Sequence, residues 1–116
     1  MFQPQDTKIA IQVLLTGLST FLTGDFLDAA AYCQEASEIF RMSDGLHRPL
    51  FDTAVAVHDF SGTAALAESD EFSSLCTLSQ SVLTMLTYIR SDHSFHILEQ
   101  LVKHLLEENE RVRCDK

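Results

Sequence analysis

The chain has 116 residues, of which 17 are acidic and 8 basic, and its formal net charge is −9. This length predicts a single domain that can bury a core without disulfides or a metal. The acidic balance disfavours nucleic acids and anionic membranes as partners, because both require a basic face on the protein. With only 4 Gly and 2 Pro, and with no alternating strand pattern, the sequence predicts an all-α fold.

The first expected helix covers residues 7–22, with Asp6 or Thr7 as its N-cap. A glycine inside a helix costs about 1 kcal/mol relative to alanine, so Gly17 predicts that another helix approaches closely there. Apolar or small residues recur every three to four positions and predict burial around most of this helix: Ile9, Ala10, Ile11, Val13, Leu14, Leu15, Leu18, Phe21 and Leu22.

Gly24 is expected to end this helix in the left-handed conformation. Asp25 is then placed to cap a second helix that runs to about Met42. The short connection requires an antiparallel pair, an αα-hairpin. Small residues on the second helix allow the first to pack closely: Ala29, Ala30, Cys33 and Ala36.

Four further helices are expected, at residues 50–58, 63–68, 70–90 and 95–112. Residues 59–62 are expected to be a non-helical break between the first two of these helices. Ser69 or Asp70 is the expected cap of the long helix, and Asp92 or Ser94 that of the last one.

The three turns near Gly24, Ser61 and Asp92 recur with an average period of about 34 residues, and a period of this length with one helical hairpin per unit is typical of tetratricopeptide (TPR) arrays. The best unit, residues 15–40, resembles one TPR in the order and spacing of small, turn and aromatic residues: Gly17, Gly24, Asp25, Phe26, Ala29 and Ala36, with Tyr32 near the aromatic position. The other two units lack the turn glycine, and the usual closing proline is missing after Phe40. The resemblance implies three antiparallel helical hairpins in a TPR-like array or a compact helical bundle.

Three degenerate hairpins in an acidic chain of this size are also similar to the layout of the small TPR-like chaperones of type III secretion needle subunits. That resemblance implies a small chaperone or adaptor that holds an amphipathic helical partner in an apolar groove. The width of the first apolar stripe and the array layout predict the residues that line the groove: Leu14, Leu18, Phe21, Phe51, Val55 and Leu83.

The last helix carries a heptad pattern whose a and d positions are apolar except for Asn109, and comprise Phe95, Leu98, Val102, Leu105, Asn109 and Val112. One interpretation is that this face docks on the preceding helix. The alternative is that it pairs with a second copy or another chain, with Asn109 setting the register. The chain would then be a self-associating, dimeric helical bundle with a regulatory or structural role.

Catalytic and metal-binding patterns are weak. His93 and His96 are three residues apart and could share a metal, but no third and fourth ligands follow at a set spacing. The sequence has no glycine-rich phosphate loop and no G-x-S-x-G motif. We therefore expect that the chain is not an enzyme and that it binds no metal and no other cofactor.

The three cysteines are an odd number without C-x-x-C spacing, which fits reduced thiols and a cytoplasmic protein. Cys33 and Cys76 lie on apolar helix faces and are expected to be buried, whereas Cys114 is expected to be exposed in the tail.

Overall fold

The computed structural model describes residues 4–43, 45, 47–66, 71–88 and 95–114. In those residues the chain forms five helices and no strand: α1 (Pro4–Leu22), α2 (Phe26–Arg41), α3 (Arg48–Leu66), α4 (Glu71–Tyr88) and α5 (Phe95–Cys114). The prediction of an all-α fold is confirmed. The caps predicted at Ser69 or Asp70, the turn around Asp92 and Ser94, and the side chain of Cys114 lie outside the described residues.

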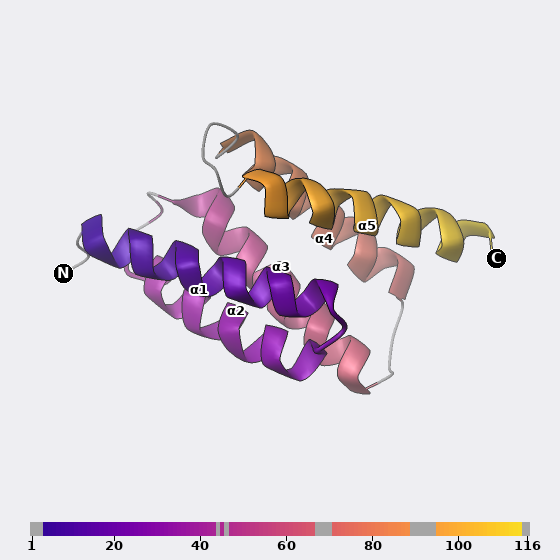
Figure 1. Cartoon of the computed structure of the whole chain (residues 1–116), viewed down its shortest axis with the longest axis horizontal. Helices are drawn as coiled ribbons and strands as arrows, with labels where there is room; N and C mark the ends of the chain where they lie inside the picture. Colours follow the sequence, from indigo (N-terminus) through magenta and orange to yellow (C-terminus); the bar gives the residue numbers. More distant parts are fainter. Residues whose placement is uncertain (1–3, 44, 46, 67–70, 89–94, 115–116) are drawn as a thin grey trace.

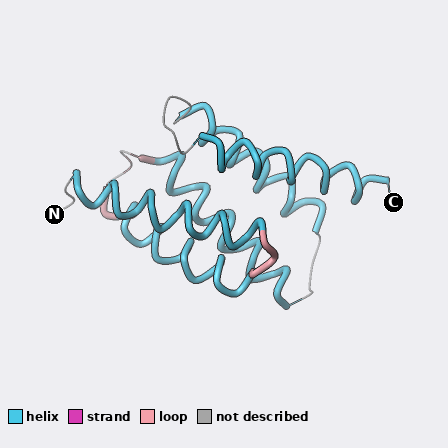
Figure 2. The backbone as a smooth tube through the Cα atoms, in the orientation of Figure 1, coloured by secondary structure: helices cyan, strands magenta, loops and turns pink. Residues whose placement is uncertain are grey.

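The five helices are arranged as a closed ring. The most extensive contacts join α2 to α1 and to α3, α4 packs on α3, and α5 packs on α4 and also reaches α1. Figure 1 shows α1, α2 and α3 grouped in one half of the molecule and α4 with α5 in the other, and Figure 2 shows how little of the described chain lies outside helices. The molecule measures 47 × 28 × 23 Å along its principal axes.

The α1–α2 turn is a glycine-terminated helix end of the Schellman type. Gly24 has a positive φ of 87°, which glycine adopts without steric cost. The Gly24 amide donates to the carbonyl of Phe21 at 3.1 Å, and the Asp25 amide donates to that of Thr20 at 2.9 Å. The predicted role of Gly24 is confirmed.

Two predicted caps differ in detail from the structure. Asp25 occupies the N-cap position of α2, but its side chain makes no capping hydrogen bond. Instead, its carboxylate accepts a hydrogen bond from the Thr23 hydroxyl at 3.2 Å. Helix α1 begins at Pro4, so Asp6 lies in its first turn rather than at its cap. Proline is favoured at the first position of a helix because the amide there needs no intrahelical partner.

Helix α2 packs closely against α1 at Gly17. A Cβ atom added there would lie 2.7 Å from Cys33 Sγ and 3.2 Å from Tyr32 Cβ. Both distances are shorter than ordinary van der Waals contact. The predicted close approach of another helix at Gly17 is confirmed.

Helix α3 is continuous where the sequence analysis expected an interruption at residues 59–62, so that prediction is wrong. The physical reason is burial: one face of the helix extends without a break through Leu50, Ala54, Val57 and Ser61. Phe60, inside the expected break, packs its ring 5.7 Å from that of Phe21. This packing outweighs the helix-breaking tendency of glycine, about 1 kcal/mol for Gly62. The expected six helices are therefore five in the described part of the chain.

Candidate protein-interaction surface

Half of the residues predicted to line a groove belong instead to the core. Leu14 and Leu18 are fully buried, and Phe21 is nearly so. The ring of Phe21 contacts Phe60 on α3 and also lies 6.3 Å from the ring of His104 on α5. Because α5 reaches α1, the chain itself covers the face that the array layout would leave open to a partner.

The other three predicted groove residues lie on separate surfaces. Phe51 and Val55 are half-buried and one turn apart on α3, whereas Leu83 is exposed on α4. The Thr53 hydroxyl donates to the Ser81 carbonyl at 2.9 Å, which shows where α3 faces α4. Phe51 and Leu83 are each two residues from these positions and therefore point away from that contact. The structure does not bring the six residues together.

The heptad face of α5 packs on α4 in the described part. Leu105 is buried in the core, Val102 is half-buried against it, and the Asn109 amide donates to Ser79 Oγ at 3.1 Å. The side chains of Phe95, Leu98 and Val112 lie outside the described ones. Leu101 is fully buried although the heptad pattern omits it, so the packed face of α5 is wider than the heptad stripe.

An apolar stripe runs along the outside of the α1–α2 hairpin. We call it the outer seam and define it by Ile9, Val13, Tyr32, Ile39 and Met42. Ile9 is 51% exposed, Tyr32 38% and Met42 63%, while Val13 and Ile39 are half-buried. These include three of the six large apolar side chains that are exposed in the described residues.

The register of the hairpin places these residues together. The Gly17 position lies beside Tyr32, so moving one turn back along α1 reaches Val13 and two turns back reaches Ile9. In an antiparallel pair the matching direction along α2 is forward, where two turns from Tyr32 reach Ile39 and nearly three turns reach Met42. From the sequence, Ile9 and Val13 were predicted to be buried packing residues of the first helix. That prediction missed that these residues lie at the edge of the apolar stripe of their helix.

The two edges of the outer seam differ in charge. On α2 the edge carries Asp28 and Glu35, both exposed and seven residues apart, and Met42, seven residues after Glu35, continues the same row at the end of the helix. On α1 it carries Gln12 and Thr16, both uncharged, and the Thr16 hydroxyl donates to the Gln12 carbonyl at 2.9 Å. The ion pairs found among the described residues, Arg48 with Asp52 and Arg111 with Glu108, involve neither edge.

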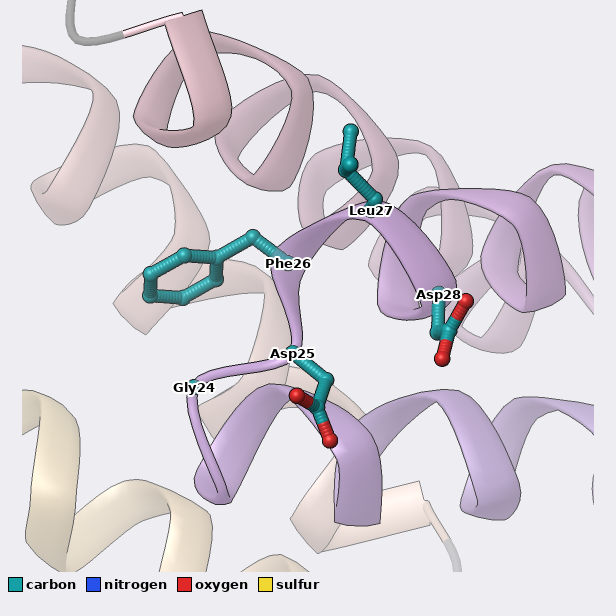
Figure 3. A pocket seen from close by; sticks show the side chains of 5 residues that line it. All are labelled: Gly24, Asp25, Phe26, Leu27 and Asp28. Carbon is teal, nitrogen blue, oxygen red and sulfur yellow. The ribbon is translucent and has the colours of Figure 1, made fainter.

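A shallow depression of about 430 Å³ lies at the α1–α2 turn, lined by residues 24–28. Figure 3 shows that Phe26 and Leu27 leave the first turn of α2 in different directions, with the carboxylates of Asp25 and Asp28 on the side away from Leu27. The depression is open to solvent, unlike a cleft that buries most of a ligand's surface.

Catalytic and metal chemistry finds little support in the described residues. No group of three His, Cys, Asp or Glu side chains there could hold a metal ion; His96 is exposed, and His93 lies outside the described residues. Burial raises the pKa of the Cys33 thiol to about 12, so the thiol stays protonated and is a poor nucleophile near neutral pH. Within the described residues no helix has the length and apolar character needed to span a bilayer.

Comparison of the chain with protein-family models, with curated proteins and with solved structures gives no match. Its function is therefore inferred from its surface.

Proposed function

We propose that this chain is a protein-binding module, a small cytoplasmic chaperone or adaptor of TPR-like helical hairpins, and that it holds an amphipathic helix of a partner protein against the outer seam. The exposed apolar stripe formed by Ile9, Tyr32 and Met42 carries the proposal. The first hairpin, with Gly17 at the helix contact and Gly24 at the turn, supports the TPR-like part of it.

A helix laid along two antiparallel helices buries their shared apolar edge, as in helix-in-groove recognition. Full burial of a large apolar side chain stabilises by about 1.5–3 kcal/mol. Ile9 and Met42 are roughly half exposed, so covering them contributes about 1 kcal/mol each. This favours a reversible complex in which several modest contacts act together.

The test uses a designed amphipathic helix of about 18 residues, long enough to span the seam, with leucine on one face and glutamine elsewhere. Its binding is followed by fluorescence anisotropy. The double variant Ile9→Ser/Met42→Ser is expected to bind about 30-fold more weakly, the equivalent of about 2 kcal/mol.

Leu27→Ser is the matched control, because Leu27 is 75% exposed and lies at the other end of α2 from Met42, about 140° around the helix from Tyr32. Circular dichroism and urea unfolding confirm that each variant keeps its fold. If the designed helix does not bind saturably, or if the seam and control variants bind equally well, the proposal is overturned.

A second candidate function is self-association through the outer edge of the α4–α5 hairpin. Leu83 is 43% exposed and Leu106 is 53% exposed. The Ser79–Asn109 hydrogen bond sets the register of α4 against α5. Leu83 lies one turn after Ser79 on α4, and Leu106 lies one turn before Asn109 on α5. Light scattering tests this: a dimer that Leu106→Ser dissociates supports it, and a monomeric wild-type chain excludes it.

A further inference from the structure

The charge asymmetry of the outer seam bears on the kind of helix that it would accept. Asp28 and Glu35 lie along one edge, on the same side of α2. Seven residues are two helical turns, so their Cα atoms are about 10 Å apart along the axis. Residues seven apart on a partner helix share that spacing and also lie on one side.

We infer that the partner helix carries basic residues seven positions apart along one edge, which meet Asp28 and Glu35, and uncharged polar residues along the other edge, which faces Gln12 and Thr16. This inference rests on the proposed function, since it specifies the partner of the same surface. Opposite charges at the rim of an apolar contact select the partner and its orientation more than they add affinity.

A second copy of this chain fits the seam less well. Two copies bring together net charges of −9 each, and like charges oppose association. The exposed side of α5, another amphipathic helix that a copy could offer, carries Glu99, Glu107 and Glu110 beside Lys103. Glutamates would then face the acidic edge of the seam.

The experiment compares two peptides with the same leucine face. One has glutamine along both edges, and the other has two lysines, seven residues apart, along one edge. An exposed ion pair strengthens binding about two-fold, so both pairs together are expected to give about a four-fold advantage to the lysine peptide. The advantage is expected at about 20 mM salt and is largely lost at about 500 mM, where charges are screened.

The double variant Asp28→Asn/Glu35→Gln is expected to remove the advantage of the lysine peptide. Its matched control is Glu107→Gln/Glu110→Gln, which changes the net charge equally on an exposed part of α5 away from the seam. The control is expected to keep most of the advantage.

The outcomes distinguish a failure of this inference from a failure of the proposed function. If both peptides bind the wild-type chain equally at low salt, or if the control loses the advantage as fully as the seam variant, the inference about a basic edge is overturned while the proposed function stands. If neither peptide binds, both proposals are overturned. A homodimer that Ile9→Ser dissociates would replace the foreign helix with a second copy.

Discussion

Replacing Gly17 with alanine tests how tightly α1 and α2 are packed. The added Cβ would lie 2.7 Å from Cys33 Sγ, roughly 1 Å inside ordinary contact. Overpacking of this kind costs about 1–3 kcal/mol, whereas alanine gains about 1 kcal/mol over glycine inside a helix. We expect Gly17→Ala to lower the free energy of unfolding by about 1 kcal/mol.

Gly62→Ala is the matched control, because it makes the same change inside α3, where the new Cβ would have no neighbour within 4 Å. It should raise the free energy of unfolding by about 1 kcal/mol, so the two variants differ by about 2 kcal/mol, which isolates the packing cost. Urea unfolding followed by circular dichroism measures both. Combining Gly17→Ala with Cys33→Ala removes the closest atom and should recover part of the loss. If Gly17→Ala stabilises as much as Gly62→Ala, the tight contact at Cys33 does not exist.

Three further predictions concern single groups. The pKa of the Cys33 thiol is raised from 9.0 to about 12, so only the unfolded chain loses this proton as the pH rises above 9. The wild type should therefore lose about 2 kcal/mol of stability between about pH 8 and 10.5 relative to Cys33→Ala. Parallel curves of unfolding free energy against pH for the two proteins would contradict this. Gly24→Ala should cost about 1 kcal/mol in urea unfolding, because Gly24 has a positive φ. Asp25→Ala breaks no capping bond and should cost less than about 0.5 kcal/mol. A larger loss for Asp25→Ala would show that the Asp25 side chain caps α2 in solution. Asn109 Nδ2 donates to Ser79 Oγ, but Asn109 Oδ1 is buried without a hydrogen-bond partner among the described residues. Asn109→Leu removes both that bond and the unpaired acceptor, so it should change the melting temperature little, whereas the charged Asn109→Asp should lower the free energy of unfolding by about 2 kcal/mol. Equal losses would contradict the unpaired acceptor.

The features that the sequence predicted correctly are those with a local cause. A glycine inside a helical stripe requires a close neighbour, and a glycine after the stripe ends the helix, so Gly17 and Gly24 were predictable from spacing alone. The interruption of α3 was predicted from the same local rules and failed. There the burial of Ser61 and the contact of Phe60 with Phe21 depend on other helices, which local patterns do not contain.

The surface was harder to predict for the same physical reason. The apolar stripe of α1 is wider than one contact, and its sequence does not say which part another helix covers. The helices around α1 decide this, since α2, α3 and α5 all contact it. Leu14 and Leu18 are buried, whereas Ile9 is 51% exposed. A partner-binding role for Asp28 and Glu35 could not be predicted from the sequence, because it depends on the exposure of the neighbouring apolar residues.

The contact between α5 and α1 also has a consequence for how the chain unfolds. In an open helical array each hairpin touches only its neighbours, so an end hairpin can unfold while the rest persists. Here the first and last helices meet, with Phe21 and His104 in contact. Unfolding α5 would expose part of α1, and this couples the two ends of the chain into one cooperative transition. A partner that stabilises the outer seam would thus protect α4 and α5 from hydrogen exchange as well, although it touches neither.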